Sequence, residues 1–253
     1  NRADTIIYWG SNPIEAHPRH LSRYTNYADA YFLHNAFRER RVIVVDVRKT
    51  PTAEIATEFV QLEQGGDYHV LSALRAIIRG RGDIIPDMVA GVPKTQLIRV
   101  ADMCKKAKFG ALFFGVGITM TGGKYKNIRN AIEFVDELNR HTKWTISPMR
   151  GHSNVYGSNE VFTWITGYPF AVDYSRGIAF YNPGETTAVD ILARKEADAA
   201  LIMASDPGAH FPRICCEHLT KIATILFDPY PSATTHLCTL QIPSAVNGID
   251  AAG

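Results

Sequence analysis

Short apolar runs alternate with longer amphipathic stretches along most of the chain. The apolar runs predict β-strands at residues 5–8, 41–46, 111–115, 144–147, 199–203, 223–227 and 238–242. The amphipathic stretches predict helices near residues 70–78, 94–106, 127–139, 186–195 and 211–221. This alternation is typical of parallel strands that crossover helices bury on both faces. We therefore expect an α/β fold with doubly wound, mostly parallel sheets.

Length, charge and hydropathy exclude several classes of protein. With 253 residues, 46% of them hydrophobic, the chain can bury a substantial core. A formal charge of +2 is too small for long-range attraction to nucleic acid, so no such partner is expected. The longest apolar runs, at residues 111–116 and 199–204, fall far short of the roughly 20 residues that a membrane-spanning helix needs. We expect a soluble, cytoplasmic protein without a membrane partner.

The two chain ends and the four cysteines limit the chemistry that this segment can carry out by itself. Residue 1 is not Met and residue 253 closely follows a predicted strand, so both ends are expected to be cuts in a longer polypeptide. The four cysteines are Cys104, Cys215, Cys216 and Cys238. They form no C-x-x-C pair and have no spacing suited to zinc or an iron–sulfur cluster. We therefore expect buried thiols and no metal ligand in this segment.

An internal repeat is the most informative feature of the sequence. One predicted strand is followed by Trp-Gly-Ser-Asn-Pro at residues 9–13, and another by Ala-Ser-Asp-Pro at residues 204–207. The next strand of each copy ends in an acid, Asp46 in the first and Asp228 in the second. Because strand, turn, helix, strand and acid occur twice in the same order, the sequence predicts two pseudo-repeated dinucleotide-binding halves.

Each half has residues suited to a ligand at the carboxyl end of a parallel sheet. Loops there expose backbone N–H groups, and an acid at the end of the next strand can accept from ribose or purine groups. The predicted binding residues are Gly10, Ser11, Asn12, Pro13, Asp46 and Arg48 in the first half, and Ser205, Asp206, His210 and Asp228 in the second. His210 and Arg213 are interpreted as repeating the positions of His17 and Arg19. Arg75, Arg79 and Arg81 cluster near a helix end and are interpreted as surface or subunit contacts.

A glycine-rich loop follows the predicted strand at residues 111–115. No G-x-G-x-x-G fingerprint is present, but Gly115 and Gly117 precede a predicted helix. A plain turn explains these two glycines by themselves. Their place between the two half-sites favours contact with a pterin or a phosphate.

With these motifs, the chain resembles the molybdopterin oxidoreductase superfamily. Residues 149–157, Met-Arg-Gly-His-Ser-Asn-Val-Tyr-Gly, are similar to the Arg-Gly-x-x-Asn-Val-x-Gly stretch that lines the active site of its formate dehydrogenases. The resemblance implies catalytic roles for Arg150 and His152 and cofactor binding by Asn154. A guanidinium can stabilise charge on a formate-like transition state, although spacing alone would also fit a surface Arg. His152 suits a proton relay or a structural role, and Asn154 a pterin edge or an ordinary turn.

A closer resemblance, over essentially the whole chain, is to the B subunit of formylmethanofuran dehydrogenase. It rests on residues 163–169, 181–185 and 204–212, including Ser-Asp-Pro-Gly-Ala-His-Phe-Pro. The resemblance implies two-electron reduction of carbon dioxide via formate toward N-formylmethanofuran, or its reverse, as the first step of methanogenesis. The implied cofactor is tungsten or molybdenum held by two molybdopterin guanine dinucleotides. An iron–sulfur cluster and the metal-ligating Cys or selenocysteine are expected in an N-terminal region outside this segment.

The resemblance also implies partners and a domain plan. Expected partners are a pterin-binding β-barrel subunit, an amidohydrolase-like subunit and ferredoxin-like subunits. Residues 1–110 are expected to form the first half and to associate with the second half at residues 190–253. Residues 111–189 would be a central segment that carries the Arg150 loop.

Two other functions remain open at this point. A cofactor-free scaffold subunit of a bacterial formyltransferase/hydrolase complex has a similar chain and fits the absence of a Cys-rich region. A formate dehydrogenase-like chain is the other alternative, against which residues 205–212 argue.

Overall fold

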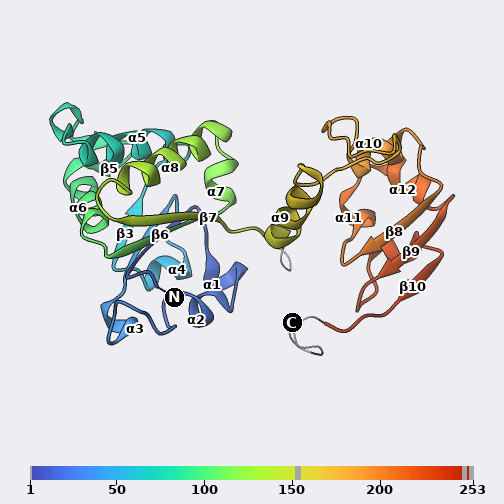
Figure 1. The fold of residues 1–253 in the computed structure, drawn as a ribbon, viewed down its shortest axis with the longest axis horizontal. Helices are drawn as coiled ribbons and strands as arrows, with labels where there is room; N and C mark the ends of the chain where they lie inside the picture. Colours follow the sequence, from blue (N-terminus) through green and yellow to red (C-terminus); the bar gives the residue numbers. More distant parts are fainter. Residues whose placement is uncertain (1, 152–154, 247–249, 251–253) are drawn as a thin grey trace. The chain divides into compact units, whose positions relative to one another are not determined.

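The computed structural model describes residues 2–151, 155–246 and 250. The chain divides into two compact units, one up to residue 152 and the other from residue 153 (Figure 1). We call them the N-terminal unit and the C-terminal unit and describe each by itself.

The N-terminal unit contains a five-stranded parallel sheet in the order β3-β2-β1-β6-β7. Its strands are β1 (Thr5–Trp9), β2 (Arg41–Asp46), β3 (Glu58–Gln61), β6 (Phe109–Phe114) and β7 (Lys143–Pro148). Ile7 of β1 lies opposite Ile43 of β2 on one side and Leu112 of β6 on the other. All strands run the same way, so their carboxyl ends meet at one edge of the sheet.

Helices cover both faces of this sheet (Figure 1). On one face, α5 (Asp67–Ile78), α6 (Lys94–Lys105) and α8 (Tyr125–Leu138) pack on Ile7, Trp9 and their neighbours in a large apolar core. The other face, with Ile6 and Tyr8, packs on the segments between β1, β2 and β3. These segments hold the short helices α1 (Pro13–Ala16), α2 (His20–Arg23), α3 (Ala36–Glu39) and α4 (Pro51–Glu54).

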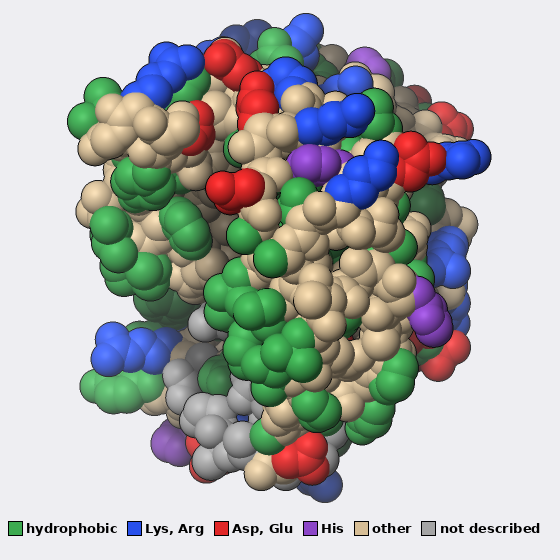
Figure 2. Space-filling model, turned by 90° about the vertical axis from the view of Figure 1, so that its right-hand side faces the viewer, with side chains coloured by type: hydrophobic (Ala, Val, Ile, Leu, Met, Phe, Trp, Pro, Cys, Tyr) green, Lys and Arg blue, Asp and Glu red, His purple; other side chains and the backbone are tan. Residues whose placement is uncertain are grey.

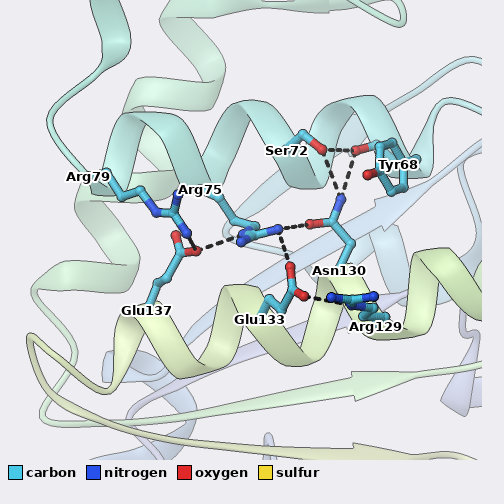
Figure 3. A network of polar contacts seen from close by, with 8 residues as sticks. All are labelled: Tyr68, Ser72, Arg75, Arg79, Arg129, Asn130, Glu133 and Glu137. Carbon is cyan, nitrogen blue, oxygen red and sulfur yellow. Dashed lines mark hydrogen bonds and ion pairs between the residues drawn. The ribbon is translucent and has the colours of Figure 1, made fainter.

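A polar network joins α5 to α8 (Figure 3). Glu137 is 3% exposed and accepts from Arg75 at 2.8 Å and from Arg79. Arg75 also donates to Asn130 at 2.7 Å and pairs with Glu133 at 2.6 Å. The interpretation as surface contacts fits Arg79 and Arg81, whose side chains are 52% and 63% exposed. It was wrong for Arg75, which is 19% exposed and bonds to side chains of the facing helix.

The C-terminal unit contains a three-stranded parallel sheet in the order β10-β9-β8. The strands are β8 (Ala199–Met203), β9 (Ala223–Phe227) and β10 (Leu240–Ile242). Its helices are α9 (Val155–Thr166), α10 (Ala188–Ala193), α11 (Pro207–His210) and α12 (Arg213–Leu219). Ile202 and Leu226 pack on Leu192, Cys215 and Leu219 from α10 and α12, so one face of the sheet is covered.

The predicted fold class is confirmed, since both larger sheets are parallel and alternate with helices. The strands predicted at residues 41–46, 199–203 and 223–227 have those bounds. Two elements were not predicted from the sequence: β3, whose end residues Glu58 and Gln61 are polar, and α9, in which polar and apolar residues are mixed. The remaining elements are the hairpin β4 (Met88–Val89) and β5 (Val92–Pro93), α7 (Val116–Thr119), η1 (Gly82–Ile84) and η2 (Ala233–His236).

The boundaries of the compact units differ from the predicted domain plan. Strands β6 and β7, which were assigned to a central segment, pair with β1 and with each other inside the N-terminal unit. The predicted association of residues 1–110 with 190–253 stays a prediction. In the described parts of the chain, no helix is long and apolar enough to cross a membrane.

Candidate functional site

The first candidate corner lies where β1 ends. Gly10 donates its N–H to Val45 O at 2.8 Å and has a φ of +55°, so the chain leaves the sheet in a left-handed turn. Asn12 then caps α1, and Pro13 occupies its first turn, where a missing N–H is tolerated. We call residues 9–13 with Thr52 the first corner.

The loop after β6 crosses the end of β1 at close range, which explains the glycines at positions 10, 115 and 117. Gly117 donates its N–H to Gly10 O at 3.1 Å, and Gly115 donates to Trp9 O at 3.0 Å. A Cβ on Gly10 would lie 2.8 Å from the Cα of Gly117, and one on Gly115 would lie 2.5 Å from Gly10 O. The loop after β6 can therefore pass β1 only because all three residues lack side chains. This is a structural reason for Gly115 and Gly117, while their contact with a cofactor stays a prediction.

Asn12 is held by a threonine from α4, the helix that follows β2. Thr52 donates its hydroxyl to Asn12 Oδ1 at 2.7 Å and its N–H at 3.4 Å. The same hydroxyl accepts from the N–H of Ile14 at 3.2 Å. Thr52 lies six residues after Asp46, whose Oδ1 accepts from the N–H of Arg48 at 3.3 Å. Asp46 thus shapes the turn that leads to Thr52.

The second corner repeats this geometry in the C-terminal unit. Asp206 caps α11 with φ −118° and ψ 71°, against −119° and 75° for Asn12. Thr234 donates its hydroxyl to Asp206 Oδ1 at 2.6 Å and its N–H at 2.9 Å. The hydroxyl of Thr234 accepts from the N–H of Gly208 at 2.9 Å, as Thr52 does from Ile14. We call residues 203–207 with Thr234 the second corner.

The match extends to both sides of the second corner. Ala204 has a φ of +47° and donates to Phe227 O at 2.9 Å, as Gly10 does to Val45 O. Thr234 again lies six residues after the acid, and Asp228 Oδ1 accepts from the N–H of Tyr230 at 3.1 Å. The hydrogen bonds from Thr234 lower the pKa of Asp206, so this carboxylate stays ionised at neutral pH.

The alignment of His210 with His17 was wrong by one residue. The N–H that closes α1 belongs to His17 and bonds Pro13 O at 2.9 Å. The N–H that closes α11 belongs to Phe211 and bonds Pro207 O at 2.8 Å. Phe211 therefore corresponds to His17, whereas Arg19 and Arg213 correspond as predicted. His210 has an exposed side chain in the last turn of α11, and its binding role stays a prediction.

The Arg150 loop is attached to the first corner. Nε2 of His17 donates to the backbone carbonyl of Arg150 at 2.6 Å. Met149 donates its N–H to Phe114 O at 2.7 Å, and its sulfur accepts from the hydroxyl of Ser11 at 3.2 Å. Arg150 thus follows the end of β7 beside the first corner, with an exposed side chain. His152 and Asn154 lie outside the described residues.

Sequence reasoning assigned no role to four residues: Thr52 and Thr234 in the corners, and His17 and Met149, which attach the Arg150 loop to the first corner. Thr52 and Thr234 could have been found, because each follows a strand-ending Asp by six residues. His17 and Met149 gave no such signal, since their partners lie far away in sequence. Among the described residues, no group of three or more His, Cys, Asp or Glu side chains is placed to hold a metal ion. The four cysteines form no disulfide, and Cys104 and Cys215 are buried.

Sequence comparison relates the chain to curated proteins. It is 51% identical to the B subunit of the tungsten-containing formylmethanofuran dehydrogenase 2 of Methanocaldococcus jannaschii over 253 residues, and 46% identical to that of Methanococcus maripaludis. Each match covers all of this chain. Along its whole length, the chain is a sequence relative of the formylmethanofuran dehydrogenase B subunit. It spans 58% of the length of each of these two relatives.

More distant matches include a formate dehydrogenase and a solved structure. Formate dehydrogenase H of Escherichia coli is 23% identical over 197 residues, which is 67% of this chain and 26% of that protein. A chain of the formyltransferase/hydrolase complex of Methylorubrum extorquens, solved with methylofuran, aligns with a TM-score of 0.66 and 19% identity. That alignment covers 98% of this chain and 64% of the other, and it shows a shared fold. No family model matches the chain. The matches to the two curated B subunits confirm the resemblance to the formylmethanofuran dehydrogenase B subunit that was predicted from the sequence.

Proposed function

We propose that this chain is the α/β part of the formylmethanofuran dehydrogenase B subunit that binds its tungsten- or molybdenum-pterin cofactor, with one guanine dinucleotide at each corner. The observation that carries the proposal is the duplicated corner. Asn12 with Thr52 and Asp206 with Thr234 have the same backbone angles and the same hydrogen bonds. Two similar loop conformations at the carboxyl ends of parallel strands suit two similar ligands.

The donor set of the corners fits a phosphate-containing ligand. Among the hydrogen bonds between described residues, none uses the backbone N–H of Ser11, Asn12, Ser205 or Asp206. These N–H groups at the sheet edge can donate to phosphate oxygens. Asp46 and Asp228, at the ends of β2 and β9, would accept from ribose or guanine groups. Arg48, with an exposed side chain, would add positive charge at the first corner.

Arg150 is the proposed catalytic residue. A guanidinium can donate two hydrogen bonds to a carboxylate and stays charged at any physiological pH. The bound tungsten or molybdenum pterin would supply the two electrons for reduction of carbon dioxide to formate. His17, through its bond to the Arg150 carbonyl, would hold the Arg150 backbone beside the first corner. His152 and Asn154 remain proposed members of the same site.

The rest of the enzyme is expected to supply what this segment lacks. An iron–sulfur cluster and the metal ligand would come from an N-terminal region of the same polypeptide. A β-barrel subunit would complete the dinucleotide sites, an amidohydrolase-like subunit would join formate to methanofuran, and ferredoxin-like subunits would carry electrons. We place the assembly in the cytoplasm.

Cofactor analysis of the native full-length protein tests the proposal. Tungsten or molybdenum and about two guanine nucleotides per polypeptide are expected after acid extraction. Thr52→Val and Thr234→Val each lose the hydroxyl bonds of one corner and keep its backbone N–H bond, and in each variant the guanine content should fall to about one. Thr142→Val removes the hydroxyl of a half-buried threonine outside both corners and should retain two. A metal-free and nucleotide-free protein would instead favour the scaffold function.

A kinetic comparison separates the remaining alternative. A formate dehydrogenase-like enzyme would oxidise formate at the same rate with or without methanofuran. Formylmethanofuran dehydrogenase should turn over formylmethanofuran, and removal of the methanofuran-binding partner should abolish that reaction while the cofactor stays in place.

A further inference from the structure

One face of the C-terminal sheet carries large hydrophobic side chains that no described residue of the C-terminal unit buries. They alternate along the three strands, as side chains on one face do, and they are Leu201, Met203, Ile225, Leu240 and Ile242. Leu201 and Met203 are 60% and 63% exposed. Figure 2, which views the molecule from the right-hand side of Figure 1, shows groups of hydrophobic side chains on that surface. Because parallel sheets are normally buried on both faces, this sheet lacks one cover.

The internal repeat indicates which kind of elements would pack on the exposed face of this sheet. By the register of the two corners, Met203 corresponds to Trp9 and Leu201 to Ile7. In the N-terminal unit, Trp9 and Ile7 are at most 1% exposed, under α5, α6 and α8. These helices all come from residues 62–151, which follow the third strand of the N-terminal repeat. The described residues after β10 contain no counterpart of these helices.

The edge of the C-terminal sheet is open in the same way. Strand β1 pairs with β2 on one side and with β6 on the other, whereas β8 pairs, among the described strands, with β9 alone. Trp9 accepts from Gly115 beyond the end of β6, so its backbone faces that neighbour. Met203, its counterpart, therefore directs its N–H and C=O to the open edge of β8, and so does Leu201, two residues earlier.

An apolar groove runs along this open edge. Its volume is about 380 Å³, and it is lined by residues from β8, α10 and α12 and the loop before α12, among them Ile191, Leu201, Ile202, Met203 and Phe211. The groove combines apolar walls with the backbone N–H and C=O groups at the open edge of β8. An added β-strand requires both features.

We infer that a parallel strand from the part of the full-length polypeptide outside these 253 residues adds to β8, in the register of β6 on β1, and that helices adjoining it cover the Leu201 face. The two curated relatives have room for these elements, because this chain spans 58% of their length. We expect the added strand to be apolar, because the side chains on both faces of β8, its neighbour, are apolar. This inference does not depend on the proposed cofactor.

One detail of the added strand follows from Ala204. In the N-terminal unit, Gly117 approaches Gly10 so closely that a Cβ on Gly10 would lie 2.8 Å from its Cα. Ala204 has a Cβ at the corresponding position. The loop after the added strand must therefore pass the second corner at a greater distance than the loop at Gly115 and Gly117 passes the first.

Hydrogen exchange on the purified full-length polypeptide tests the inference at residue level. The amides of Leu201 and Met203 should exchange as slowly as that of Ile202, which faces β9, on the order of a thousandfold below the rate of an unstructured peptide. Near-unstructured rates at Leu201 and Met203, with Ile202 protected, would overturn it. Protection that depends on protein concentration would indicate a second copy, and protection found only in the assembled enzyme would indicate another subunit. Either of these outcomes also contradicts the inference.

A substitution gives an independent readout. Leu201→Lys in the full-length protein should lower the Tm by roughly 10 °C, because a charge would be buried under the added elements. The matched control is Ile132→Lys, at a site of comparable exposure, 52%, on the N-terminal unit. That control should shift the Tm by less than about 2 °C. If Leu201→Lys behaves like Ile132→Lys, the face is open to solvent and the inference fails.

Discussion

The indole nitrogen of Trp9 donates a 2.8 Å hydrogen bond to the carboxylate of Asp67, and both side chains are buried. The bond joins the end of β1 to the start of α5, across 58 residues of sequence. The other carboxylate oxygen of Asp67 is buried without a hydrogen-bond partner among the described residues. Burial raises the pKa of Asp67, and the bond from Trp9 offsets this only in part.

Asp67 should make stability fall as the pH rises. Its pKa is higher in the folded than in the unfolded chain, so the folded state holds the proton more tightly. The contribution of Asp67 to the free energy of unfolding is therefore largest below the unfolded pKa, near 4, and declines as the pH passes through the folded pKa. Asp67→Asn, which keeps an acceptor for Trp9, should remove this dependence.

Urea unfolding of the wild type and Asp67→Asn at intervals from pH 4 to 7 measures the effect. The difference in unfolding free energy, wild type minus variant, should decrease with pH. A constant difference over that range would mean that Asp67 titrates alike in both states.

His20 should have the opposite effect at acid pH. Burial, with a smaller contribution from the charge of His17, lowers the pKa of His20 to about 4. A neutral imidazole is therefore favoured by folding, and its stability contribution is complete above the unfolded pKa, near 6.5, and lost as the pH falls toward 4. His20→Phe keeps the edge-to-face contact with Phe113 and removes the titration. Relative to this variant, the free energy of unfolding of the wild type should fall by roughly 2 kcal/mol between pH 7 and 4. Parallel curves of unfolding free energy against pH for the two proteins would contradict the expectation.

The α5–α8 network should depend on one of its two acids. Glu137→Gln leaves Arg75 and Arg79 without their buried counter-charge and should cost about 3 kcal/mol of unfolding free energy. Glu133→Gln is the matched control, since Glu133 is 37% exposed and pairs with Arg75 and Arg129 at the surface. It should cost less than about 1 kcal/mol. Equal costs in chemical denaturation would show that burial of Glu137 does not decide the effect.

The two corners should respond differently to changes in side-chain size. Gly10→Ala combines a left-handed φ with a clash against Gly117 and should cost about 2–4 kcal/mol. Ala204→Gly relieves the same φ without such a neighbour and should change stability by less than about 1 kcal/mol. Thermal unfolding of both variants checks the pair, and a harmless Gly10→Ala would refute the tight crossing of β1 by the loop after β6.

Arg150 should matter for turnover and not for cofactor retention. In the assembled enzyme, Arg150→Ala should lower kcat for carbon dioxide reduction by about 100- to 1,000-fold, because the proposed function makes this guanidinium a charged donor to the reacting group. Metal and guanine content should stay at wild-type values, and Arg150→Lys should recover part of the rate. Loss of the cofactor in Arg150→Ala would assign this side chain to binding instead.

The sequence by itself determined the parallel α/β class and the repeat. Strands buried on both faces have continuous apolar runs, so residues 41–46 and 199–203 could be recognised without partners. The repeat of Asn12 and Asp206 was visible because each corner is built from residues close together in sequence. The strand β3 could not be recognised, since Glu58 and Gln61 are polar and its place at the sheet edge depends on pairing with β2.

Only the tertiary structure decided the contacts between distant segments. Nothing local in the sequence links Thr52 to Asn12, Glu137 to Arg75, or Arg150 to His17, because each pair meets through the packing of separate elements. The one-residue correction from His210 to Phe211 has the same origin. The shared residue type suggested that His210 aligns with His17. The hydrogen bond that closes each short helix instead aligns Phe211 with His17, because backbone geometry and not residue type sets the register of a turn.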